Sequence, residues 1–205
     1  MFRPDSVLMR LLDRLATLVM LNIYFLLCCL PLVTIGASTT ALYTVTLQEA
    51  RGDARSITAS FFRAFRKNFW KATVLWLFVA FFTAVFVIDL ALFTRNGAPR
   101  FLRILLCIAG IFFALMLPYL FPLQARFENT LRMTLRNALM LGIAKLPSTL
   151  LMLLMLLLPL ILLYISEQLF WRLAIFWVLL GFALTAQFCS YLLHRIFSKI
   201  TDNAA

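Results

Sequence analysis

The apolar positions of this chain gather in long uninterrupted runs instead of alternating with polar positions. The first run, from residue 15 to residue 48, contains no Asp, Glu, Lys or Arg. A continuous helix of that length would reach roughly 51 Å, whereas the hydrocarbon core of a bilayer needs about 30 Å. Pro31 and Gly36 lie in the middle of the run, where a helix would stop and turn. The pattern predicts a membrane hairpin with spans at about residues 15–32 and 34–50 and a turn through Thr34-Ile35-Gly36.

Four further apolar runs follow the hairpin, and each is long enough to cross a bilayer. Asp89 is the only charged residue inside them. They do not show the alternation of apolar and polar positions that is typical of a membrane β-barrel. The sequence therefore predicts six transmembrane helices, the last four at about residues 72–93, 104–123, 148–165 and 173–193.

Composition agrees with this interpretation. Apolar residues make up 64% of the chain and charged residues 13%, against about 45–50% and about 25% in soluble domains. A soluble fold of this size could not bury so much apolar surface. We expect an all-α polytopic membrane helix bundle, a single domain over residues 1–205. A cleaved signal peptide is the alternative for the first run, but Asp5, Asp13 and the length of the run argue against it.

The distribution of Lys and Arg predicts the orientation in the membrane. With six spans and both termini in the cytoplasm, 15 of the 19 basic residues fall on the cytoplasmic side. A five-span alternative, without the second span and with the amino terminus outside, leaves 12 on that side. The six-span arrangement is therefore favoured. The basic residues then face anionic lipid, which accounts for the net charge of +11, and we expect no nucleic-acid partner.

Residues 56–71 form a predicted amphipathic helix between the second and third spans. Aromatic side chains cover one arc at 100° per residue, and basic side chains cover the opposite arc. This pattern favours an interfacial helix, with two roles open: a topological anchor or a docking surface for a cytosolic partner. A second inner helix is predicted at about residues 127–146. The residues of the first helix on which this interpretation depends are Phe61, Phe65 and Phe69 on the aromatic face and Arg63, Arg66 and Lys67 on the basic face.

The second span is the most polar of the six. Small and hydroxyl residues recur along it at four-residue steps, which lets helices approach closely. We expect it inside the bundle or against another subunit, with a substrate-lining role as the alternative. Asn22 in the first span is its expected hydrogen-bond partner, and Gly36 is expected to supply a positive φ at the turn. The turn and stripe consist of Pro31, Thr34, Gly36, Ser38, Thr40 and Thr44.

Candidate catalytic chemistry is scarce. All four cysteines fall inside apolar spans without paired or metal-ligand spacing. The single histidine, His194, has no acid or nucleophile beside it in sequence, and no phosphate loop or nucleophile motif occurs. We therefore expect no enzyme activity, no cofactor and no bound metal. Any energy used must come from a partner or a gradient.

A set of residues in the first half of the chain has an order and spacing that are found in a known family. These residues are Leu30-Pro31, Thr34 to Tyr43, Arg51-Gly52, Phe61-Phe62, Phe65, Asn68-Phe69 and Ala72-Thr73. Through them, residues 20–75 resemble the YesL family of bacterial membrane proteins. The likeness implies a multi-pass protein of the bacterial cell membrane, in a genomic context of carbohydrate ABC importers. It brings no catalytic residue with it.

A short motif at the end of the second span has a separate likeness. Glu49-Ala50-Arg51-Gly52 resembles the loop by which importer permeases dock their ATPase, although the glycine comes early and Arg51 departs from the motif.

Two functional hypotheses follow. The first is an accessory subunit of a carbohydrate ABC importer that binds its permeases within the lipid bilayer and contacts the cytosolic ATPase through the inner helices. The alternative is a self-sufficient small transporter or channel that acts as an oligomer. Asp89 is the only charge inside a span, so sites for coupling transport to an ion are scarce.

Overall fold

The computed structural model describes residues 7–53, 56–96, 99–127 and 129–202, and this part of the chain is helical without strands. The prediction of an all-α fold is confirmed. The elements in order are α1 (Val7–Cys29), the 3₁₀ turn η1 (Leu32–Thr34), α2 (Ile35–Ala50), α3 (Ile57–Asn96), α4 (Arg100–Arg126), α5 (Leu131–Ala144), α6 (Leu146–Ile165), α7 (Glu167–Phe176), the π-helix η2 (Trp177–Gly181) and α8 (Phe182–Asp202).

Helix α2 lies at the centre of the fold. Most of its residues are buried, and it packs most extensively on α3, with α8 and α4 next. The expectation that this polar segment lies inside the bundle agrees with this position. The core continues from α2 into the first half of α3, the end of α4 and α8, where Phe61, Tyr119 and Phe197 are fully buried.

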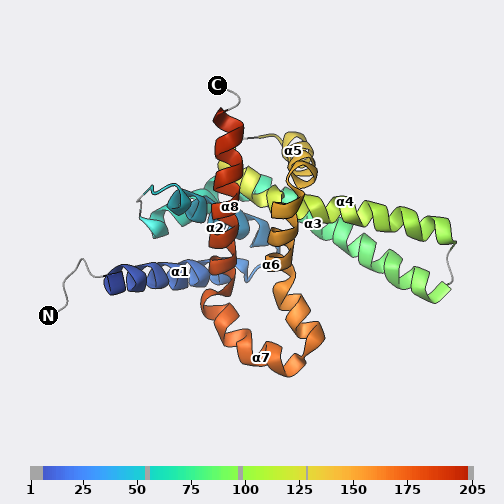
Figure 1. The fold of residues 1–205 in the computed structure, drawn as a ribbon, viewed down its shortest axis with the longest axis horizontal. Coiled ribbons are helices and arrows are strands. Elements are labelled where there is room, and N and C mark those ends of the chain that lie inside the picture. The colour runs from blue at the N-terminus through green and yellow to red at the C-terminus, as the bar shows by residue number, and fades with distance from the viewer. Residues whose placement is uncertain (1–6, 54–55, 97–98, 128, 203–205) are drawn as a thin grey trace.

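Other helices extend outward from this centre. In Figure 1, α3 and α4 run side by side to the right, while α6 and α8 run across that direction and are joined by α7 below. Exposed apolar side chains cover the outer part of the α3–α4 pair, including Phe81, Ile88, Phe101 and Ile111. We call this outer part the α3–α4 arm. The arrangement is branched, where the sequence had predicted six spans in one bundle.

Within the residues that the structure describes, five helical segments are long and apolar enough to cross a membrane, which supports a multi-pass membrane protein. They lie in α1, α3, α4, α6 and the continuous run from α7 to α8. Helix α2, the expected second span, has 16 residues and is not among them. Six spans, and the cytoplasmic placement of both termini, stay predictions.

The expected inner helix at residues 56–71 is not a separate element. It forms the first turns of α3, which continues to Asn96 without interruption. The helix continues because the residues at the expected boundary, Lys71 and Ala72, are neither proline nor glycine, which could end a helix. A separate helix does form in the second region, as α5, where the hydroxyl of Thr130 caps the first turn by accepting a hydrogen bond from the Met133 N–H at 3.4 Å. Its placement on the cytoplasmic side stays a prediction.

The turn between α1 and α2 ends at Thr34, two residues before Gly36, where the sequence predicts its end. Thr34 closes it, because its hydroxyl donates to the carbonyl oxygens of Cys28 at 2.6 Å and Pro31 at 2.7 Å. Gly36 lies inside α2, and the glycine with positive φ is Gly52 in the loop that follows α2. The expectation that Gly36 supplies a positive φ is therefore wrong.

Candidate functional site

At Gly36, α2 and α3 approach each other closely. A Cβ atom added there would overlap the carbonyl oxygen of Ala72 and lie 2.5 Å from Cβ of Trp76. The Trp76 indole N–H donates to the carbonyl oxygen of Leu32 at 2.9 Å, which ties α3 to the turn before α2. The small-residue stripe predicts a close approach of helices at Gly36, and in the structure this approach is to the backbone of α3.

The hydroxyl groups of α2 are used within the protein. Thr40 donates to the carbonyl of Gly36 at 2.9 Å, and Thr44 donates to that of Thr40 at 2.8 Å. Thr46 is fully buried and shares a hydrogen bond of 2.7 Å with Ser190 of α8. Ser38 is also fully buried. Thr40 and Thr44 therefore bond to carbonyls of their own helix, and Thr46 also joins α2 to α8.

Asn22 serves a different helix from the one expected. Its side-chain amide donates to the carbonyls of Trp177 at 3.2 Å and Val178 at 2.5 Å, and its Oδ1 accepts from the Ala183 N–H at 2.9 Å. These groups belong to η2 and the first turn of α8. A π-helix breaks the regular hydrogen-bond ladder of an α-helix, and Asn22 partners backbone groups at that break. No sequence pattern indicates a π-helix at η2, so the sequence predicts α2 as the hydrogen-bond partner of Asn22 instead.

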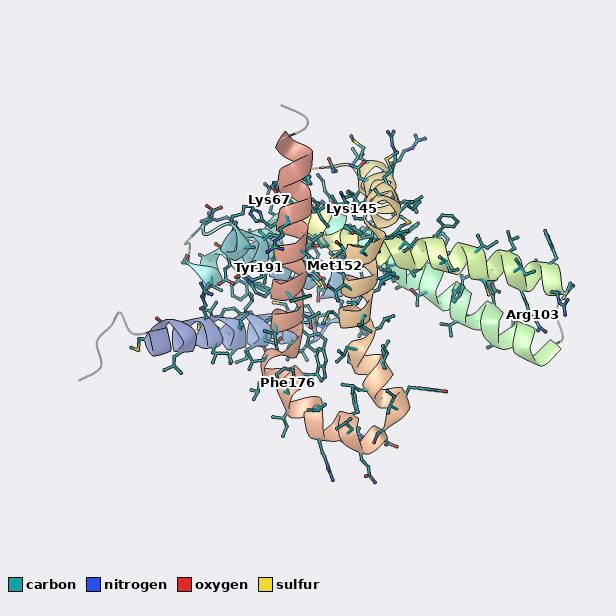
Figure 2. The ribbon with its side chains drawn as sticks, in the orientation of Figure 1. Lys67, Arg103, Lys145, Met152, Phe176 and Tyr191 are labelled. Carbon is teal, nitrogen blue, oxygen red and sulfur yellow. The ribbon has the colours of Figure 1, made fainter. Side chains whose placement is uncertain are left out.

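A basic pocket lies between the carboxyl-terminal end of α2, the first half of α3 and the end of α4. Its volume is about 260 Å³. We call it the basic pocket, and its lining consists of Thr44, Gln48, Ser60, Arg63, Ala64, Lys67, Asn68, Gln124, Ala125, Arg126 and Phe127. Figure 2 shows Lys67 in the central part of the molecule and Arg103 at the outer end of the α3–α4 arm. Three cations from two helices thus share one cavity.

The faces of α3 differ from the expected arrangement. Phe61 is fully buried, with its ring centroid 6.0 Å from that of Tyr24, whereas Trp70 is 79% exposed. Arg63 and Lys67 line the basic pocket, but Arg66 lies with the aromatic side chains. The first turns of α3 therefore pack on the protein through Phe61. One neighbouring side of the helix faces the basic pocket, and another carries the aromatic side chains. The aromatic cluster around Arg66 consists of Phe62, Phe65, Phe69 and Trp70.

A second cavity of about 470 Å³ lies between α1, the end of α2 and α8. Polar groups reach it from each side, namely Arg14, Glu49, Asp53, Gln187 and Tyr191. The Gln187 Oε1 atom is buried there without a hydrogen-bond partner. The loop that resembles the ATPase-docking motif of importer permeases therefore borders this cavity.

In the described part of the chain the four cysteines are free, and no group of three or more His, Cys, Asp or Glu residues there could hold a metal ion. Asp89 and His194 are each partly buried on separate helices. The sequence pointed to the polar helix, but it missed the basic pocket, because Arg126 belongs to a segment distant from Arg63 in the chain.

Comparison with known proteins gives one family match and one relative, and each covers part of the chain. Residues 18–90 match the family described as "Protein of unknown function, DUF624". The chain is also 30% identical over 136 residues to "Uncharacterized protein YteU" of Bacillus subtilis (strain 168). That alignment covers 65% of this chain and 61% of the relative, so the chain spans less than two thirds of the relative's length. No solved structure matches. The family match covers α2, about half of α1 and most of α3. Of these, α2 and α3 meet at Gly36 and line part of the basic pocket.

Proposed function

We propose that this protein is a YesL-type accessory subunit of a bacterial carbohydrate ABC import system, located in the cell membrane. In this proposal it binds permease subunits within the bilayer and the ATPase through its inner loops, and it catalyses no reaction itself. Support comes from the likeness over residues 20–75 and from the family match over residues 18–90. The carbohydrate context rests on the family likeness alone.

The observation that carries a binding role is the state of the polar groups on α2. Thr40, Thr44 and Thr46 donate to carbonyls of their own helix, and Thr46 also bonds to Ser190. A transport path would need polar groups that face a cavity and can exchange partners with a substrate. The hydroxyls of Thr40 and Thr46 are instead buried and bonded within the protein. The polar residues of α2 that line the basic pocket, Thr44 and Gln48, lie in its carboxyl-terminal half. This arrangement favours a packed subunit over a conduit.

The α3–α4 arm supplies an apolar surface for contact within the bilayer. Phe81 is 64% exposed and Ile111 is 60% exposed, and they lie on the outer parts of α3 and α4. Within lipid, helices associate through close packing, since lipid tails are as apolar as the side chains. The helices of a permease are the partners that this proposal assigns to the arm, with lipid filling the remaining surface.

Site-specific photo-crosslinking in native membranes tests the proposal. A crosslinking amino acid at Phe81 or Ile111 should capture a permease subunit, identified by mass spectrometry. The same amino acid at Met152, which is fully buried, should capture no other chain and serves as the control. Capture of lipid only, or a single species after mild detergent extraction, would contradict the accessory role. Substrate flux into liposomes that contain this protein alone would favour the alternative of an independent transporter.

A further inference from the structure

Arg126 carries a positive charge that is held in place. Its guanidinium carbon lies 5.5 Å from the ring centroid of Phe127 and 5.1 Å from that of Phe197. The Nη1 atom is buried and has no hydrogen-bond partner. The rings stabilise the cation through their faces, but a buried donor without an acceptor is costly, and more so when it is charged. The group therefore lacks an acceptor that an anion would supply.

Further positive charge surrounds the same cavity. Arg63 enters the lining from α3, and Arg51 is close enough to repel the charge of Arg126. Lys67 also lines the cavity, but it already interacts within the protein. Arg63 and Arg126 are therefore the cations considered as ligands for an anion. Among the described lining residues there is no carboxylate. Like charges around one cavity disfavour the folded state unless an anion neutralises them.

The size of the basic pocket and the uncharged polar residues in its lining indicate which kind of anion would fit. Its volume of about 260 Å³ lies just below the range of about 300–1,000 Å³ that is usual for drug-sized ligands. Gln48, Ser60 and Gln124 add amide and hydroxyl groups to the lining. An oxygen-rich anion with several acceptors, such as a phosphate group, suits charged and neutral donors together.

We propose that the basic pocket binds a phosphate group, with Arg63 and Arg126 as its main ligands. The phosphate belongs either to the headgroup of an anionic phospholipid or to a small soluble phosphate ester, and the chemistry is the same for both. Basic pockets between membrane helices commonly hold anionic lipid headgroups. The neighbouring aromatic cluster, with Trp70 79% exposed, is typical of the level where headgroups lie. This site does not depend on the importer proposal.

Native mass spectrometry of the full chain in detergent tests the lipid source. We expect phosphatidylglycerol to bind at least about tenfold more tightly than phosphatidylcholine. Both lipids carry a phosphate, but the choline cation of phosphatidylcholine is repelled by the arginines, whereas phosphatidylglycerol has a net negative charge. Arg63→Gln should lose about that preference. Arg66→Gln is the matched control, since it removes the same charge from the same helix but lies in the aromatic cluster outside the pocket.

Thermal unfolding without anionic lipid tests the soluble source. Inorganic phosphate and glycerol 3-phosphate should raise the unfolding temperature of the wild type and of Arg66→Gln but not of Arg63→Gln. Sodium chloride at equal ionic strength is the control for general screening. Because Arg126→Gln can fail to fold, Arg126→Lys is the second variant: it keeps the charge but loses the planar fork, so its affinity should fall between those of wild type and Arg63→Gln.

The outcomes separate clearly. A lipid preference that Arg63→Gln abolishes supports a headgroup phosphate, and stabilisation by phosphate ester alone supports a soluble ligand. Equal losses in Arg63→Gln and Arg66→Gln would overturn the proposal, because the effect would then follow net charge and not the pocket. No dependence on any phosphate compound in either arm would also overturn it.

Discussion

Helices α2 and α6 have similar lengths, 16 and 20 residues, but opposite surroundings. Most residues of α2 are buried by α3, α8 and α4, whereas only Thr149 and Met152 of α6 are buried. From hydropathy alone one would expect the opposite, because α6 is apolar except near its start, whereas α2 is rich in hydroxyls. The comparison teaches that in this membrane protein the polar helix organises the fold, while the most apolar helix mainly presents a surface to its surroundings.

The largest effect is expected at the crossing of α2 and α3. Gly36→Leu places a side chain against the carbonyl of Ala72, where the backbone leaves no room. Overpacking costs about 1–3 kcal/mol in ordinary cores, and contact with backbone favours the upper end. We expect loss of accumulation in the membrane, measured by immunoblot. The matched change on α6, Leu156→Phe, should leave accumulation unchanged because Leu156 is exposed. Equal tolerance at both sites would refute the difference between the helices.

The next effect concerns the bond from α1 to the π-helix. Asn22→Leu removes one acceptor and two donated hydrogen bonds and leaves buried backbone groups without partners. The expected loss is about 1–3 kcal/mol of unfolding free energy, measured by denaturant titration in micelles. The neighbouring Ile23→Ala, on the exposed side of α1, should change it much less. A loss for Ile23→Ala as large as that for Asn22→Leu would show that Asn22 has no special role.

A smaller effect is expected for the hydroxyl pair between α2 and α8. Thr46→Val removes the bond to Ser190 with little change in shape. Hydrogen bonds between membrane helices average about 0.6 kcal/mol, so the unfolding free energy should fall by about that amount. Thr39→Val is the control, because Thr39 donates to its own helix at Ile35. If the two variants behave alike, the contact between α2 and α8 contributes little to stability.

Single cysteine substitutions, which should disturb the protein least, test whether α2 connects opposite faces of the membrane. In a background with the four cysteines replaced by alanine, a cysteine at exposed Val33 should react with a membrane-impermeant reagent from outside, and one at exposed Asp53 from the cytoplasm only. Ser38 is unsuitable for this purpose because it is fully buried. Labelling of both positions from one side would remove α2 from the set of spans and favour the five-span arrangement.

The sequence predicts where most helices lie but not how neighbouring helices join or contact one another. The apolar runs located α1, α3, α4, α6 and α8, since burial in lipid leaves an uninterrupted pattern. The hydroxyls and Gly36 indicated that α2 packs among other helices. Continuity through Lys71 and Ala72 was missed because an amphipathic pattern gave way to an apolar one without any break in the backbone. The π-helix held by Asn22 and the meeting of Arg63 with Arg126 depend on contacts between distant segments, which no local pattern records.

Tryptophan scanning of α2 and α6 tests the central claim most directly. A tryptophan is tolerated where a helix faces lipid and rejected where it faces packed protein. We predict that tryptophan at buried positions of α2, from Ala37 to Leu47, abolishes accumulation on every side of the helix, whereas exposed positions of α6, from Leu150 to Ile161, accept it. A lipid-tolerant stripe on α2 that repeats with the period of a helix would contradict the account.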